Sequence, residues 1–266
     1  MDIVPPAIGA RRRSRFELQE ILLTAGRDLL VEDGLSLGAG GLTFKRVFDA
    51  LEATHGVRLT NASVIRRVWE NQAEFQADCL VHLAESADMS GEVAATLDVL
   101  MPMSGDFDLW SSEGRLRAMQ DLARVGGEVS IRSRVATREW SLWMGVWVLS
   151  VTGTRDGPRS VVHDALLEGL EHVADLWDQI YEVIMVNLGF RLRSGFTMRQ
   201  FTVSSATLVE GMTARQGGSQ EVDLIPLPTG PEGAVEEWTL FGIALDALGK
   251  QFFELDPLWT PPPRPA

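Results

Sequence analysis

The stretch from Thr43 to Phe75 constrains this chain most, because its pattern predicts two short helices joined by a turn and followed at once by a third helix. Apolar residues at Val47, Phe48 and Leu51 give the first helix one face that can be buried. Gly56 is expected to end that helix, since glycine adopts left-handed backbone angles without the clash of a Cβ atom. The stretch therefore predicts a compact helical unit.

The second helix of the pair is expected over Ala62–Trp69, with Thr60 or Asn61 as its N-cap. Its apolar face consists of Val64, Ile65, Val68 and Trp69. The residues expected on its other face are all capable of hydrogen bonding, and two of them are cationic: Asn61, Ser63, Arg66 and Arg67. Such a pair is typical of the helix-turn-helix, whose second helix lies in the DNA major groove. The spacing fits equally well an ordinary helical hairpin whose arginines only solvate one face.

A basic arm and an amphipathic helix precede this pair. The arm contains Arg11, Arg12, Arg13 and Arg15, and the helix is expected over Phe16–Asp33, closed by Gly34. As a whole, residues 11–84 resemble the DNA-binding domain of the TetR (tetracycline-repressor-like) family of bacterial regulators. The segments that carry the resemblance are ILLTAGRDLLVEDG (Ile21–Gly34), LTFKRVF (Leu42–Phe48), HGV (His55–Val57) and VWENQAEFQADCL (Val68–Leu80).

The resemblance implies an all-α protein with a three-helix helix-turn-helix domain over residues 11–84 and a larger helical effector-binding and dimerisation domain over residues 85–256. It implies a ligand-responsive transcription regulator, most often a repressor, that binds a palindromic operator in double-stranded DNA as a homodimer. Effector binding would shift the connecting helix Gln72–Ala87 and release the DNA. The residues that would contact DNA are Arg11, Arg12, Arg13, Arg15, Thr43, Lys45, Thr60, Asn61, Ser63, Arg66 and Arg67.

The charge distribution leaves an alternative open. The net charge is −13, yet residues 1–84 contain 10 Lys and Arg against 11 Asp and Glu, so most of the acidity lies further along the chain. Any DNA affinity must therefore come from locally placed cations. Gln72 and Arg66 stand where the family carries a basic residue and a tyrosine. These features favour a helical small-molecule-binding or interaction protein of the same fold without specific DNA binding.

The expected location is the cytoplasm. Cys79 is the single cysteine, which excludes an intramolecular disulfide and suits a reducing compartment. No stretch approaches the roughly 18 uncharged apolar residues of a membrane span, and the first ten residues lack the apolar run of a leader peptide. The longest apolar segment, Trp140–Thr152, predicts a central buried helix, and no membrane partner is expected.

Helical periodicity continues almost to the end of the chain, without an alternating strand pattern of useful length. The expected helices are Gly91–Met101, Leu109–Ala136 (with an interruption at Gly126-Gly127), Arg138–Val151, Pro158–Leu188, Thr197–Arg215 and Val235–Leu255. Gly217–Gly233 is expected to be a loop, and Pro257–Ala266 an extended or disordered tail. Thr197–Gln216 resembles the penultimate helix of the family, which implies that this helix and the last one form a four-helix bundle between two subunits. Packing within a single subunit is the alternative.

No catalytic or metal chemistry is expected. Glu168, His172 and Asp175 recur at i, i+4 and i+7, but one imidazole without a second cluster favours a solvated helix face over a metal site. The chain shows neither a glycine-rich phosphate loop after a strand nor a nucleophile–base motif. We therefore expect a protein that is not an enzyme and that needs no cofactor or metal.

Crowded aromatic and sulfur-containing side chains point to a ligand site. Trp140, Trp143 and Trp147 share one helical face, with Met144 on the same side. Bulky aromatics that interlock poorly leave concave apolar sites, although a core built from large side chains gives the same pattern. Since the family binds small effectors in this domain, we expect a small apolar or aromatic effector. The expected contacts are Trp110, Arg138, Trp140, Trp143, Met144, Trp147, Trp177 and Tyr181.

Overall fold

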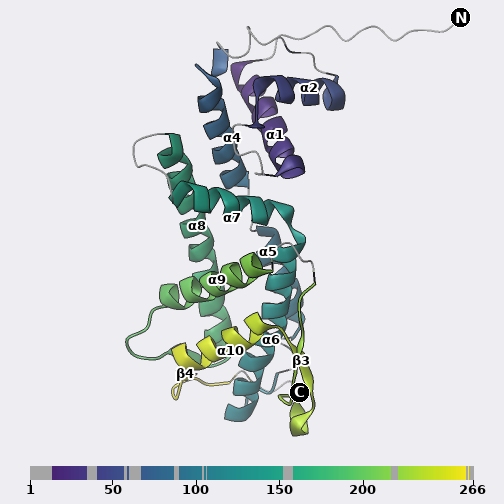
Figure 1. Cartoon of the computed structure of the whole chain (residues 1–266). Helices are drawn as coiled ribbons and strands as arrows, with labels where there is room; N and C mark the ends of the chain where they lie inside the picture. Colours follow the sequence, from purple (N-terminus) through teal and green to yellow (C-terminus); the bar gives the residue numbers. More distant parts are fainter. Residues whose placement is uncertain are drawn as a thin grey trace, which may run out of the picture. The chain divides into compact units, whose positions relative to one another are not determined.

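The computed structural model describes residues 14–34, 41–56, 59, 67–86, 90–103, 105, 107–151, 158–216, 221–261 and 263. Over these residues the chain is mostly helical, as predicted (Figure 1). It divides into two compact units, Met1–Ser86 with Gly145–Ala165, and Ala87–Met144 with Leu166–Ala266. Helices α7 (Arg138–Val151) and α8 (Pro158–Asn187) contribute residues to both units. None of the described helices combines the length and apolar character required to cross a membrane.

In the first unit, α1 (Arg15–Asp33) packs against α2 (Phe44–His55) and α4 (Gln72–Ser86). The ends of α1 and α2 follow local chemistry. Ser14 and Glu17 form a reciprocal capping box at the start of α1, and the Thr43 hydroxyl caps α2. Gly56 ends α2 with φ 62° in the left-handed region, which confirms the predicted end of this helix.

Aromatic side chains connect these helices in the core of the first unit. The ring centroid of Phe75 lies 4.6 Å from that of Phe44 and 4.8 Å from that of Trp69. Trp69 is also fixed by a hydrogen bond of 2.7 Å from its Nε1 to Asp78 Oδ2. Aliphatic residues of α1 and α2 are fully buried in the same unit: Leu22, Val47 and Leu51.

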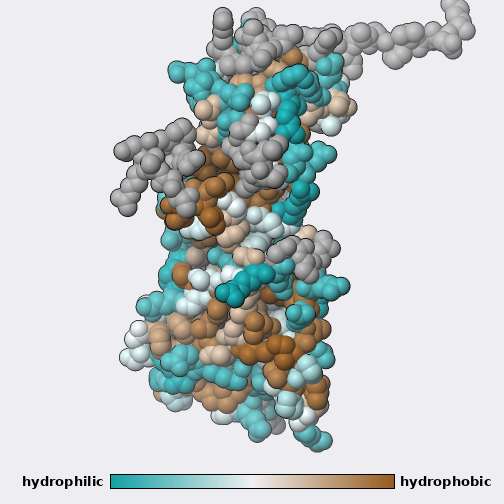
Figure 2. Space-filling view, viewed as in Figure 1, coloured by the Kyte–Doolittle hydropathy of each residue, from teal (hydrophilic) through white to brown (hydrophobic). Residues whose placement is uncertain are grey.

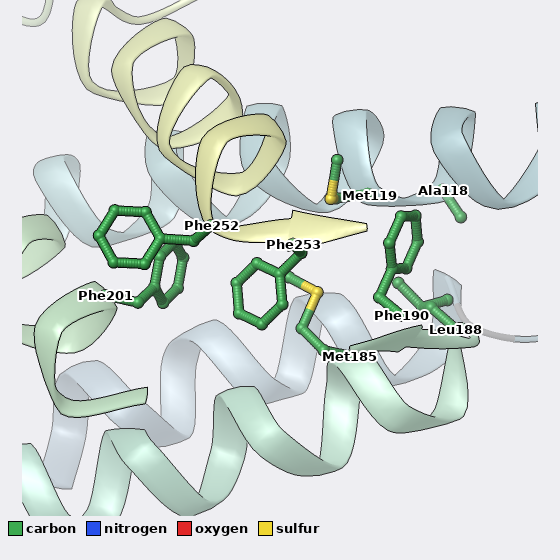
Figure 3. Packing of buried hydrophobic residues seen from close by; sticks show 8 residues of the cluster. All are labelled: Ala118, Met119, Met185, Leu188, Phe190, Phe201, Phe252 and Phe253. Atoms are coloured by element: carbon green, nitrogen blue, oxygen red, sulfur yellow. The ribbon is translucent and has the colours of Figure 1, made fainter. Parts of the chain in front are cut away.

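In the second unit, α6 (Ser112–Ala136) packs against α5 (Ser90–Met103), α9 (Met198–Arg215) and α10 (Leu240–Phe252). A phenylalanine- and methionine-rich core joins α6, α8, α9 and the end of α10 (Figure 3). Its buried members are Ala118, Met119, Met185, Leu188, Phe190, Phe201, Phe252 and Phe253.

Two small antiparallel sheets complete the second unit, and their strands were not predicted. Strand β1 (Phe190–Leu192) pairs with β4 (Phe253–Leu255), which ties the chain after α8 to the chain after α10. Strand β2 (Ile225–Leu227) pairs with β3 (Glu236–Trp238) across a turn that contains η2 (Pro231–Gly233). Each strand is three residues long, too short for an alternating pattern to stand out in the sequence.

The last helix is therefore shorter than the predicted Val235–Leu255. Its N-terminus is set by Thr239, whose hydroxyl accepts a hydrogen bond of 2.9 Å from Gly242 N. The residues before Thr239 belong to the β2–β3 hairpin, where Trp238 Nε1 donates to Thr229 Oγ1 at 2.7 Å. Tertiary contacts thus override the helical pattern at both ends of this segment.

Three further expectations need correction. Gly126-Gly127 does not interrupt α6, which runs unbroken from Ser112 to Ala136. The α7 helix is not buried all round, since the apolar side chains near its C-terminus, Val148, Leu149 and Val151, are exposed. The start of the C-terminal tail is packed, because the Arg115 guanidinium lies 4.9 Å from the ring centroid of Trp259.

Candidate functional sites

Only part of the predicted DNA-contacting set lies within the described residues. Those outside them are Arg11, Arg12, Arg13, Thr60, Asn61, Ser63 and Arg66. The described members are Arg15, Thr43, Lys45 and Arg67. All four belong to the first unit.

Arg67 is exposed, whereas the two residues that follow it are buried. Val68 and Trp69 insert into the core of the first unit. Arg15 is the first residue of α1 rather than part of a flexible arm, and its Nη2 donates to the Val68 carbonyl at 3.4 Å. The Val68 carbonyl, next to the exposed Arg67, is therefore bonded to the first residue of α1.

The N-terminus of α2 presents cationic side chains and backbone donors. Lys45 is 82% exposed at its side chain and pairs with Asp49. Arg46, which sequence reasoning did not single out, pairs with Asp33 and donates to the Gly41 carbonyl at 3.0 Å. The Thr43 hydroxyl accepts from Arg46 N at 3.3 Å and so is used as a cap. Helix N-termini favour anions, but a phosphate group here would compete with Asp33 and Asp49 for the two cations.

A cavity opens inside the second unit, among helices α5, α6, α8, α9 and α10. The cavity volume is about 60 Å³, several times the roughly 10–15 Å³ that one water needs but less than the roughly 150 Å³ of a dry apolar cavity that binds benzene. The lining residues from α5 and α6 are Thr96, Leu100, Met119, Leu122, Ala123, Gly126 and Ser130. Those from α8, α9 and α10 are Trp177, Tyr181, Ile184, Met185, Phe201, Phe241, Leu245 and Gly249.

The cavity lining is apolar apart from a few hydroxyl groups, and no charged side chain belongs to its described part. Thr96 is 3% exposed, and its Oγ1 has no hydrogen-bond partner among the described residues. Trp177 stacks on Tyr181 with ring centroids 5.1 Å apart, and Tyr181 meets Phe201 edge to face at 4.9 Å. This lining suits an uncharged ligand with an apolar body better than a charged one.

Of the predicted effector contacts, the structure brings only Trp177 and Tyr181 to this cavity. Trp140 is buried and Trp143 and Met144 are half-buried on α7, while Arg138 and Trp110 are exposed. Trp147 belongs to the first unit, where its ring stacks on His163 with centroids 5.5 Å apart. The described cavity lining contains none of these six residues. The shared helical face of the α7 tryptophans thus did not reveal where the cavity lies.

The other residues that could bind a metal or act as a nucleophile, Glu168, His172, Asp175 and Cys79, have the environments of structural residues. Asp175 pairs with Arg199 of α9, while Glu168 and His172 are exposed. Among the described residues, no three His, Cys, Asp or Glu side chains come together to hold a metal ion. Burial, together with the nearby Asp78 charge, raises the pKa of the Cys79 thiol, which keeps it protonated and unreactive.

Comparison of the chain with models of protein families, with curated proteins and with solved structures finds no match.

Proposed function

We propose that this chain is a ligand-responsive transcription regulator of TetR type, acting as a cytoplasmic dimeric repressor rather than as an enzyme. Its first unit binds double-stranded DNA, and its second unit binds a small apolar effector. The resemblance of residues 11–84 to the family motivates this proposal, and features of both units support it.

The observation that carries the proposal is the way the chain leaves α2 and returns to the core. The α2 helix ends at Gly56 in a left-handed conformation, and the chain re-enters the core at Val68 and Trp69. The expected second helix of the pair falls between these two points, outside the described residues apart from its C-terminal end. Arg67, at its C-terminal end, is exposed. In a helix-turn-helix the second helix lies in the major groove, and an exposed Arg67 next to the buried Val68 and Trp69 is compatible with that placement.

The α2 N-terminus gives a second point of contact. Lys45 is exposed beside a helix N-terminus whose backbone N–H groups favour anions. Contacts to phosphate position a protein on the duplex, while contacts to base edges give sequence specificity. In this proposal Lys45 has the first role and the residues of Thr60–Arg67 have the second.

Apolar surface on the second unit supports dimerisation. Leu240 of α10 is 57% exposed and Val203 of α9 is 49% exposed. Figure 2 shows brown, apolar residues over the region where Figure 1 places α10. A two-fold dimer through α9 and α10 covers this surface and matches a palindromic operator.

The cavity supplies the response to a ligand. A ligand that binds one of two conformations more tightly than the other shifts their populations, and by linkage changes the affinity for DNA. Residues of five helices of the second unit line the cavity, so a ligand bound there would contact all five.

Selection of binding sites from random duplex DNA tests the proposed function. The full-length protein should enrich an inverted repeat with half-sites about one or more helical turns apart. Enrichment of no sequence, together with only salt-sensitive binding to any duplex, would contradict the proposal.

A helical ligand-binding protein without specific DNA binding is the second candidate function. The cavity favours it, because ligand binding there does not require the first unit to contact DNA. In that case the DNA selection fails while ligand binding persists.

A further inference from the structure

We propose that the cavity among α5, α6, α8, α9 and α10 is a built binding site for a small uncharged molecule. The ligand has an apolar body and one hydrogen-bonding group, and that group meets the Thr96 hydroxyl. This inference rests on the proposed function in that it names the class of effector, but ligand binding itself is measured without DNA.

Two glycines keep the cavity open. Gly126 of α6 and Gly249 of α10 both line it, and both lie within helices, where glycine is less favourable than alanine. A Cβ on Gly126 would lie no closer than 3.4 Å to its nearest neighbour, the side chain of Leu100. A Cβ on Gly249 would lie 3.4 Å from Met119 Sδ. These are ordinary van der Waals contacts, so helix packing does not require a glycine at either position.

The adjacent Gly127 provides the contrast. A Cβ there would lie 2.7 Å from the Gly242 Cα of α10, so close packing of two helices explains the absence of a side chain. No such explanation exists for Gly126. Its missing side chain instead leaves space in the cavity, at the expense of helix stability.

The Thr96 hydroxyl supplies the polar point of the site. A buried threonine on a helix commonly donates to a backbone carbonyl one turn earlier, which satisfies its hydroxyl. Thr96 Oγ1 has no partner among the described residues although the side chain is almost fully buried. Leaving a buried hydroxyl without a partner is unfavourable, and a ligand group that bonds to it removes that cost.

The lining excludes other ligand classes. Because no charged side chain belongs to the described lining, a phosphate, a carboxylate or a metal ion would lose its hydration without gaining a counter-charge. Aromatic and aliphatic side chains surround the space, with Trp177, Tyr181 and Phe201 on one part of the wall. Three compounds therefore form a matched set of probes: phenol has a hydroxyl group, toluene has no polar group, and benzoate carries a negative charge.

Isothermal calorimetry on the full chain tests the proposal. Phenol should bind in the millimolar range or more tightly, toluene more weakly, and benzoate not measurably. Thr96→Val, which keeps the side-chain shape, should weaken the affinity for phenol by about 3- to 10-fold. It should leave the affinity for toluene unchanged or raise it. Gly126→Ala should weaken the affinity for both neutral probes, because the added methyl group takes up space in the cavity. It should also raise the melting temperature, because alanine favours the helix.

Gly211→Ala is the control for helix stability. Gly211 lies in α9, and a Cβ added to it would have no neighbour within 4 Å among the described residues, so alanine there should raise the melting temperature without changing probe affinity. Equal phenol affinity in wild type, Thr96→Val and Gly126→Ala would overturn the inference, as would the absence of phenol and toluene binding. Probe binding with the expected pattern but no DNA binding would preserve the inference and contradict only the proposed function.

Discussion

Gly127 of α6 and Gly242 of α10 meet so closely that a Cβ on Gly127 would lie 2.7 Å from Gly242 Cα and 3.0 Å from its backbone nitrogen. Both neighbouring atoms belong to the backbone, so a side chain at Gly127 must push the two helices apart. The crossing of α6 and α10 thus depends on the absence of a side chain at this position.

We predict that Gly127→Ala lowers the free energy of unfolding by about 1–3 kcal/mol, the usual effect of overpacking. Gly126→Ala, one residue earlier, should leave stability unchanged or raise it, because its Cβ meets only a flexible leucine side chain. Denaturant unfolding of the two variants measures the difference. Equal stabilities would show that α10 moves away from α6 at little cost.

The end of a helix can be predicted from the sequence, whereas the crossing of two helices cannot. The Gly56 stop was predicted because a helix end depends on a few neighbouring residues, whereas the Thr43 cap was not singled out. The role of Gly127 was not predictable, since the residue that requires it, Gly242, lies on another helix. For the same reason the sequence predicted an interruption at a place where the structure has a close crossing.

A second pair of residues controls the packing of α1 on α4. A Cβ on Gly26 would lie 2.6 Å from Cys79 Sγ, but no closer than 3.5 Å to its other neighbours. We predict that Gly26→Ala destabilises the protein by about 1–3 kcal/mol. Cys79→Ala in the same chain should restore part of that loss.

A double-mutant cycle in thermal or denaturant unfolding measures this coupling. The two substitutions should be non-additive, with the double variant more stable than the sum of the single effects. Strict additivity would mean that Gly26→Ala acts through some other contact.

The third prediction concerns pH. Burial by itself would raise the pKa of Glu236, but hydrogen bonds from Arg117 and Thr229 and the charges of Arg117 and Arg124 hold that pKa below its ordinary value. A carboxyl group with a lowered pKa stabilises the fold above its unfolded pKa. It loses that contribution as pH falls through the folded pKa.

Glu236→Gln should therefore lower the free energy of unfolding at pH 7 by about 1–3 kcal/mol. The difference from wild type should shrink as pH falls below about 4, near and under the ordinary glutamate pKa. Unfolding curves at several pH values check this, with Glu232→Gln, an exposed residue of the same hairpin, as the control. A difference that stays constant with pH would exclude the charge of Glu236 as its cause.

The cavity, our proposed ligand site, was only partly predictable from the sequence. Trp177 and Tyr181 were expected contacts and do line the cavity. The six other residues were expected because they are bulky or lie near bulky residues in the sequence. A cavity, however, forms where side chains are missing. Gly126, Gly249 and Thr96 line this cavity from three different helices, and no local pattern relates residues so distant in the sequence.

The fourth prediction concerns assembly. If α9 and α10 form the dimer interface, Leu240→Glu should convert the protein to a monomer, because a buried charge without a partner is unfavourable at an interface. Leu258→Glu is the matched control, since Leu258 is 85% exposed and lies outside both helices. Sedimentation velocity distinguishes the species. A Leu240→Glu variant that stays dimeric would place the interface elsewhere.

The central claim is that the first unit binds a specific DNA operator through the segment that ends at Arg67. Fluorescence anisotropy with the selected operator, over a series of salt concentrations, tests it most directly. Arg67→Ala should weaken binding by about 1–3 kcal/mol if the guanidinium reads a base, or reduce the salt slope by about one if it contacts phosphate. Arg132→Ala, at an exposed arginine of α6, should bind like wild type. Identical affinity and salt slope for wild type, Arg67→Ala and Arg132→Ala would contradict the account.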